Sequence, residues 1–104
     1  MDVYIDKRVH QQIEDFYDVA LLRHPSLDEV TVMRKIQRLY DALELLGLYA
    51  SIYPISRIKE EWITKGYREY IIEDFHFAYQ IYKIENGEVF VRVHDACHSF
   101  LYHE

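Results

Sequence analysis

The chain has 104 residues, half of them hydrophobic, and a formal net charge of −6. This length and apolar content suffice for one core and exclude two independent ones, so we expect a single domain over residues 1–104. Binding to nucleic acid over a whole surface needs an excess of Lys and Arg, so the acidic balance restricts any such contact to a local patch. The acidic, mixed start, the lack of a long apolar run and the single Cys97 predict a cytoplasmic protein with no membrane association and no intrachain disulfide.

The first half of the chain has helical periodicity after a short β-prone start, Val3–Ile5. Apolar residues then recur at three- and four-residue spacing, which predicts a helix. This helix should end before Pro25, because the residue that precedes a proline avoids the α region. Ser26 and Glu29 have the spacing of a capping box for a second helix over about residues 27–46. So short a connection predicts an antiparallel helical hairpin.

The second half is predicted to be mainly strand. Residues 50–66 have no clear period and contain Pro54, so they are interpreted as a connecting loop with a short extended or helical piece. A strand should follow over residues 67–74 and end in a tight turn at Glu73 and Asp74. The expected fold is α+β, with an N-terminal strand and an antiparallel helical hairpin packed on one face of a mainly antiparallel sheet. A C-terminal three-strand meander closes that sheet.

The strongest local signal is Asn86-Gly87, which lies between two runs rich in aromatic and β-branched residues. A two-residue turn there would place Arg92 among apolar side chains. A three-residue loop over residues 85–87, with Gly87 left-handed, places Arg92 on the opposite face, and we expect this register. The expected apolar face holds Phe77, Tyr79, Ile81, Val89, Val91 and Val93. The expected working face holds His76, Gln80, Tyr82, Phe90, Arg92 and His94.

These elements resemble a known family. The strand with Tyr67-Arg-Glu-Tyr70, the hairpin from Phe75 to Tyr82, the closing Val91–His94 and the late Tyr102 are similar to the RelE/ParE superfamily of bacterial toxins. The resemblance covers nearly the whole chain and implies the toxic half of a type II toxin-antitoxin module, with a fold like that of a microbial ribonuclease. Members of the RelE branch cleave messenger RNA in the ribosomal A site, and members of the ParE branch poison DNA gyrase. The implied partners are a cognate antitoxin and either the ribosome with its mRNA or gyrase, with a homodimer also possible.

The resemblance also assigns residues. The histidine that many members carry at the end of the last strand matches His94, and their late tyrosine matches Tyr102. The arginine that RelE-type members place in the first hairpin strand falls on His76. The arginine expected past the last strand is missing, and His98 is the nearest basic group.

Cleavage of RNA at a 2′-hydroxyl needs a base, an acid and a cation that offsets charge on the phosphate. Histidine suits both proton transfers because its ordinary pKa is about 6.5. The predicted catalytic residues are therefore His76, His94, Arg92, His98 and Tyr102, with Tyr102 contacting a nucleobase of the RNA. The alternative is that His76 and His94 are partly exposed strand residues bonded to neighbours, and both interpretations stay open.

No metal or cofactor is expected. His94, Cys97 and His98 do not have the spacing of a recognised zinc site. Three functions remain: a ribosome-dependent mRNA interferase held by an antitoxin, which we rank first, a ParE-like gyrase inhibitor without nuclease activity, and a catalytically inactive RelE-fold interaction module. The ten tyrosines favour a protein partner under each of them.

Overall fold

The computed structural model describes residues 1–99. Its elements, in chain order, are β1 (Asp2–Ile5), α1 (Lys7–Arg23), α2 (Glu29–Tyr49), the 3₁₀ turn η1 (Ala50–Ile52), α3 (Glu60–Lys65), β2 (Arg68–Ile72), β3 (Phe75–Lys83) and β4 (Val89–His98). The predicted α+β class is confirmed. Within residues 1–99, no helix combines the length and the hydropathy that a membrane span requires.

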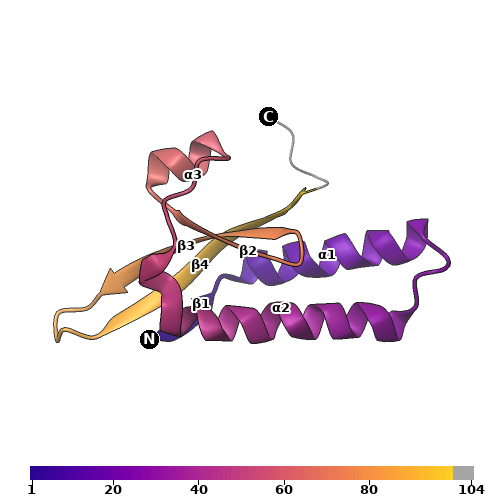
Figure 1. Ribbon diagram of the computed structural model, residues 1–104, viewed down its shortest axis with the longest axis horizontal. Helices are drawn as coiled ribbons and strands as arrows, with labels where there is room; N and C mark the ends of the chain where they lie inside the picture. The colour runs from indigo at the N-terminus through magenta and orange to yellow at the C-terminus, as the bar shows by residue number, and fades with distance from the viewer. Residues whose placement is uncertain (100–104) are drawn as a thin grey trace.

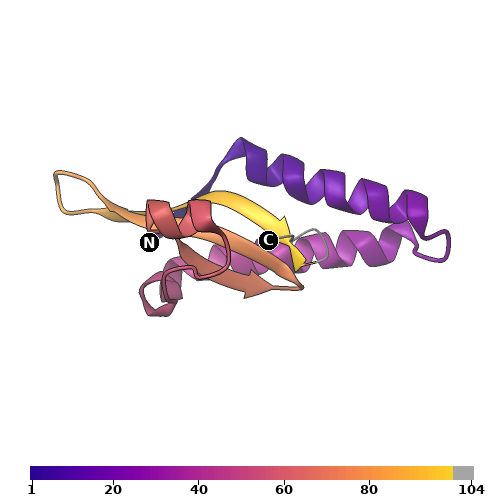
Figure 2. The same cartoon turned by 90° about the horizontal axis from the view of Figure 1, so that it is seen from above.

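The four strands form one mixed sheet in the order β1-β4-β3-β2. β2, β3 and β4 pair as antiparallel neighbours, as the predicted meander requires, and β1 is an edge strand parallel to β4. The antiparallel pair α1 and α2 covers one face of this sheet, and α3 lies on the other side (Figures 1 and 2). We call the face under α1 and α2 the inner face, and the opposite one the outer face.

The core of the protein lies on the inner face. Side chains from β3 and β4 pack there against apolar side chains of both long helices, and the fully buried ones include Phe77, Tyr79, Val91, Val93, Ile13, Leu39 and Leu43. Burial raises the pKa of Tyr79 to about 12, so its hydroxyl stays protonated. That hydroxyl donates a hydrogen bond to the carbonyl of Ala50, which ties β3 to the end of α2.

The loop between β3 and β4 is the predicted three-residue loop. Gly87 has a φ of +89°, which favours glycine, and its N–H bonds to the carbonyl of Ile84 at 2.9 Å. The N–H of Ile84 bonds in turn to the carbonyl of Glu88 at 2.8 Å. The resulting register pairs Gln80 with Arg92 and places Arg92 on the outer face, as predicted.

β4 contains a bulge that the sequence did not predict. Ala78 of β3 pairs with Asp95, and the next residue, Tyr79, pairs with Val93, which leaves His94 as an extra residue in β4. His94 and Asp95 therefore both face outward. Every residue after the bulge is shifted by one, and His98 consequently falls on the inner face.

The turn between β2 and β3 is formed by the predicted pair, Glu73 and Asp74. Both residues have positive φ, +51° and +65°, as in a two-residue type I′ turn, whose twist matches that of paired strands. The carbonyl of Asp74 accepts hydrogen bonds from the backbone N–H and from the hydroxyl of Ser99, both at 2.9 Å. The turn is thereby tied to the end of β4.

The predicted end of α1 is confirmed, since the helix stops at Arg23, two residues before Pro25. The predicted cap of α2 is wrong. Asp28 caps the helix instead of Ser26, and its carboxylate accepts a hydrogen bond of 2.7 Å from the N–H of Thr31. A carboxylate at this position also interacts favourably with the helix dipole, which a serine cannot do.

Candidate functional site

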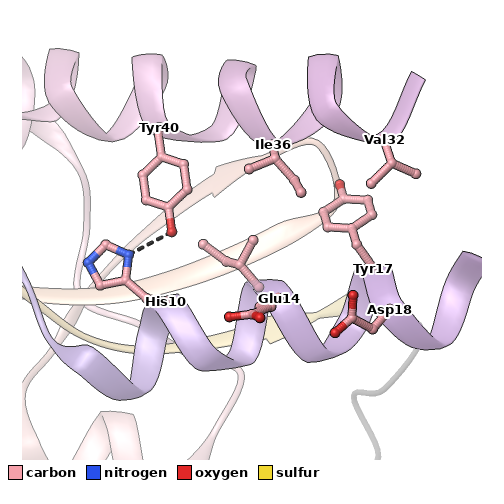
Figure 3. Close-up of a pocket in the computed structure, with 8 residues that line it drawn as sticks. His10, Glu14, Tyr17, Asp18, Val32, Ile36 and Tyr40 are labelled. Atoms are coloured by element: carbon pink, nitrogen blue, oxygen red, sulfur yellow. Dashed lines mark hydrogen bonds between the residues drawn. The ribbon is translucent and has the colours of Figure 1, made fainter. Parts of the chain in front are cut away.

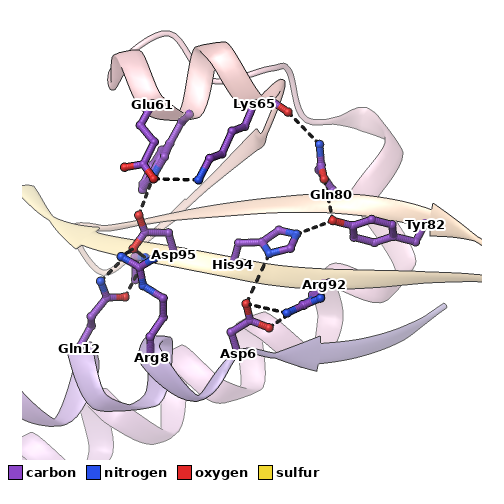
Figure 4. Close-up of polar contacts among 12 residues, drawn as sticks. Asp6, Arg8, Gln12, Glu61, Lys65, Gln80, Tyr82, Arg92, His94 and Asp95 are labelled. Carbon is purple, nitrogen blue, oxygen red and sulfur yellow. Dashed lines mark hydrogen bonds and ion pairs between the residues drawn. The ribbon is translucent and has the colours of Figure 1, made fainter.

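Polar side chains from three elements meet on the outer face around His94 (Figure 4). β4 contributes the predicted residues Arg92 and His94, and β3 contributes Gln80 and Tyr82. Asp6 directly follows β1, so the parallel pairing of β1 with β4 brings its carboxylate beside these residues. We call these five residues the outer-face cluster.

The carboxylate of Asp6 contacts both basic residues of the cluster. Its Oδ1 lies 2.7 Å from Nε of Arg92 and its Oδ2 lies 3.3 Å from a terminal nitrogen of the same guanidinium. The Oδ2 atom is also 3.4 Å from Nδ1 of His94. The bond to Arg92 lowers the pKa of Asp6 and raises that of Arg92, so both groups are charged.

Three side chains contact the ring of His94: Asp6, Tyr82 and Tyr67. Its Nε2 lies 2.7 Å from the hydroxyl of Tyr82, and its ring stacks on Tyr67 with centroids 4.8 Å apart and planes 8° from parallel. Burial lowers the pKa of His94, while the charge of Asp6 opposes that effect. Because the pKa lies below the ordinary value of about 6.5, His94 is mainly neutral at pH 7.

The hydroxyl of Tyr82 lies between two acceptors. It donates to the side-chain oxygen of Gln80 at 2.7 Å and also lies 2.7 Å from Nε2 of His94, and the amide nitrogen of Gln80 donates to the carbonyl of Lys65 at 2.9 Å. When the hydroxyl proton turns from Gln80 to His94, a neutral His94 with its own proton on Nδ1, facing Asp6, accepts it at Nε2. A protonated His94 would donate to Tyr82, whose proton would then turn to Gln80. The cluster can therefore carry a proton to or from His94 through the Tyr82 hydroxyl.

His76 lies on the outer face, as predicted, but in a separate group. Its Nδ1 is 3.1 Å from a carboxylate oxygen of Glu69, and its Nε2 is 3.0 Å from the hydroxyl of Ser99. The other carboxylate oxygen of Glu69 accepts a hydrogen bond of 2.8 Å from the hydroxyl of Ser56. Both ring nitrogens of His76 thus have partners within the fold.

Trp62 of α3 contacts β4 at Asp95, the residue that follows His94. It is fully buried, and its indole nitrogen donates to Oδ2 of Asp95 at 2.9 Å. Along β4, Asp95 stands between His94 and the residue that pairs with His76. The structure therefore places His76 and His94 on one face without bringing them together.

Asp95 is a buried carboxylate that the sequence did not single out. Burial alone would raise its pKa, but the hydrogen bonds from Gln12 and Trp62 and the charge of Arg8 outweigh burial and hold the pKa below its ordinary value. The side chain of Gln12 donates to it at 2.8 Å, and the guanidinium of Arg8 lies 3.5 Å away. Asp95 thereby joins α1, α3 and β4 (Figure 4).

His98, another predicted catalytic residue, does not lie on the outer face with His94. His98 faces α1, where its ring stacks on Phe16 with centroids 3.9 Å apart and meets the edge of Phe75 at 5.0 Å. Burial lowers the pKa of His98. The bulge at His94 is the cause, because it reverses the alternation of the residues that follow.

Tyr102, the fifth predicted site residue, lies outside the described residues. Cys97 and His98 are neighbours that face opposite sides of the sheet, so they do not converge with His94 on one ion. Among residues 1–99, no group of three or more His, Cys, Asp or Glu side chains could hold a metal.

A groove lies between α1 and α2, with a volume of about 270 Å³ (Figure 3). The ring of His10 stacks on Tyr40 there, and its Nδ1 lies 2.6 Å from the tyrosine hydroxyl. The remaining lining residues are apolar or acidic: Ile13, Glu14, Tyr17, Asp18, Val32 and Ile36. A larger hollow of about 970 Å³ lies between the second half of α1 and the end of β4.

No protein-family model matches this chain, and no curated protein or solved structure is significantly similar to it. Membership of a family therefore remains a proposal. The outer-face cluster provides the chemistry from which a function can be argued, since it combines a neutral histidine, a phenolic hydroxyl and an arginine.

Proposed function

We propose that this chain is a toxin of the RelE/ParE type that cleaves messenger RNA on the ribosome. The observation that carries the proposal is the placement of neutral His94 between the carboxylate of Asp6 and the hydroxyl of Tyr82, beside Arg92. The order of the elements, with two helices on one face of a sheet closed by three antiparallel strands, supports a RelE-like fold.

In the proposed reaction, the 2′-hydroxyl of the RNA attacks the adjacent phosphorus, and the bond from phosphorus to the 5′-oxygen of the next nucleotide breaks. The proton of the 2′-hydroxyl passes to the oxygen of Tyr82, whose own proton passes to Nε2 of His94. Asp6 stabilises the imidazolium that forms. The leaving 5′-oxygen takes a proton from water, and the proton that His94 gives back through Tyr82 neutralises the hydroxide, so the products are a 2′,3′-cyclic phosphate and a 5′-hydroxyl.

Arg92 supplies the cation for this reaction. Asp6 occupies one edge of its guanidinium, and the side chain remains 49% exposed. A guanidinium has five N–H donors, so donors remain for the oxygens of a phosphate. Arg92 and His94 lie on the same face of β4, which places the cation beside the base.

His76 has a structural role in this proposal. Its contacts to Glu69 and Ser99 join β2 to the end of β4, and these partners differ from those of His94, which are Asp6 and Tyr82. The reaction therefore uses one histidine, where two or three were predicted.

The groove between α1 and α2 is the proposed contact for the antitoxin. Its walls are apolar, and Glu14 and Asp18 add negative charge. These features favour a flexible segment with apolar side chains followed by a basic residue. Such a segment would hold the toxin from the side opposite to the outer-face cluster.

The test is induction of the chain in bacteria, followed by mapping of mRNA 5′ ends on ribosomes. We expect slow growth and new ends at discrete positions within codons, and His94→Ala should lower the cleavage rate by about 10² to 10⁴. His24→Ala, at an exposed position after α1, is the matched control. Normal growth with intact messages at confirmed soluble expression would support the inactive interaction module instead.

The gyrase inhibitor is the second candidate, and the ion pair between Arg92 and Asp6 favours it. This pair offsets part of the positive charge that Arg92 offers a phosphate, even though some of its N–H donors stay free of Asp6. DNA breaks trapped on purified gyrase, together with intact messages, would assign the chain to the ParE branch.

A further inference from the structure

Aromatic rings form a continuous row across the outer face. The row runs from Tyr4 of β1 through Phe90 of β4 and Tyr82 of β3 to His94 and Tyr67. Tyr4 meets Phe90 edge to face with centroids 5.4 Å apart, and Phe90 stacks on Tyr82 at 5.3 Å and 20°. Tyr82 meets His94 at 5.8 Å, and His94 stacks on Tyr67 at 4.8 Å. We call these five residues the aromatic row.

The row is not part of the core. The core lies on the inner face, and none of the five residues belongs to its buried set. Tyr4 is 56% exposed, and Phe90, Tyr82 and Tyr67 are half-buried. Aromatic faces and edges thus remain accessible to a ligand on the side of the sheet where the outer-face cluster lies.

Positive groups accompany the row. Arg92 pairs directly with Tyr4 across β1 and β4, so its guanidinium lies alongside the rings. The ammonium of Lys65 stands over the ring of Tyr67, 5.8 Å from its centroid. Rings for stacking, with a cation at each end of the row, are complementary to a chain of bases joined by phosphates, which would compete with Glu61 for Lys65 and with Asp6 for Arg92.

We propose that the aromatic row binds an unpaired segment of RNA and delivers its 2′-hydroxyl to the Tyr82 hydroxyl. Bases stack on the Tyr4 and Phe90 end, while Arg92 and Lys65 contact phosphates. This inference rests on the proposed function and specifies the form of its substrate. Base faces are available only in unpaired RNA, so single strands bind and duplexes do not. Stacking tolerates any base, so the row selects for strandedness more than for sequence.

The test measures binding of the full chain to a fluorescent single-stranded RNA of about ten nucleotides, within the usual site size for such surfaces. All its 2′-hydroxyls are methylated, so it cannot be cleaved by their attack. We expect Tyr4→Ala and Phe90→Ala each to weaken binding about tenfold, the scale for losing one stacked base. Phe90→Leu, which keeps apolar bulk in the strand, should weaken it similarly. Tyr49→Ala is the matched control, because Tyr49 is 52% exposed on α2, away from the row.

Equal affinities for the wild type and these variants, or tighter binding of a duplex than of the single strand, would overturn the proposal. The proposal would also be overturned if no oligonucleotide binds and the variants instead lose affinity for a co-expressed protein partner. The proposed function fails in a different way. If the row variants lose binding but messenger RNA on ribosomes is never cut, binding by the aromatic row is supported and the proposed reaction is wrong. If messenger RNA is cut equally well by the row variants, the proposed reaction is supported and binding by the aromatic row is wrong.

Discussion

The indole nitrogen of Trp62 donates a 2.9 Å hydrogen bond to Oδ2 of Asp95 on the outer face of the sheet. Trp62→Phe keeps most of the packing but removes one donor from a buried carboxylate, which should lower the free energy of unfolding by about 1 to 3 kcal/mol. Trp62→Ala also leaves a cavity, and should lower it by about 3 to 5 kcal/mol. Urea unfolding measures both. A Trp62→Phe variant as stable as the wild type would show that Asp95 does not depend on this donor.

Tyr82→Phe separates proton transfer from stacking. The variant keeps the ring that stacks on Phe90 and removes the hydroxyl that lies 2.7 Å from His94. RNA cleavage should fall by about 10² or more, while affinity for the methylated oligonucleotide stays close to that of the wild type. Tyr49→Phe, which removes a hydroxyl remote from the cluster, is the control. Full cleavage by Tyr82→Phe would rule out the relay.

The rate of cleavage should depend on pH through His94. A base must be neutral, so kcat/KM should fall as the pH drops through the pKa of His94, which burial places below its ordinary value. The charge of Asp6 raises that pKa, so Asp6→Asn should move the acid limb of the profile to lower pH and also reduce the maximum rate. A pH–rate profile of both proteins measures this. An acid limb in the same place for both would show that Asp6 does not act on His94.

Folding stability should also fall on acidification below about pH 6.5. The pKa values of His94 and His98 are lowered in the fold by burial, so the unfolded chain binds protons more readily than the folded one. Stability from this source is complete above the unfolded pKa and is lost as the pH falls below it. His98→Phe keeps the stacking on Phe16 and removes one titrating group, so its Tm should vary less between about pH 7.5 and 5.5. The variant His24→Phe, at an exposed position, should follow the wild type.

The features that the sequence predicted have local causes. Asn86-Gly87 determines the loop between β3 and β4, and the loop fixes the register that sends Arg92 outward. Pro25 ends α1, and Glu73-Asp74 forms the turn into β3. In each case the information lies within a few residues, so a single sequence is enough to interpret it.

The features that were missed depend on distant contacts. Asp6 joins the outer-face cluster only because β1 pairs in parallel with β4, across more than eighty residues of sequence. Trp62 is buried because α3 packs on the outer face, in a region predicted only as a loop with a short structured piece. The local sequence does not predict the bulge at His94, because a regular strand accommodates Val93, His94 and Asp95 equally well. Periodicity alone could not reveal any of these contacts.

The bulge gives β4 a required length as well as a required composition. Before it, residues at even positions face outward, and after it, residues at odd positions do, so Arg92 and His98 belong to opposite sides of the same strand. Loss of one residue between Val93 and Ala96 would remove the bulge and leave His98 in its stack on Phe16, but β4 would lose one of its two adjacent outward positions, those of His94 and Asp95. Substitutions in this stretch therefore change single contacts, whereas a single deletion leaves the strand unable to present both a histidine to Asp6 and a carboxylate to Trp62. Functional relatives of this chain should vary in which residues stand here before they vary in how many.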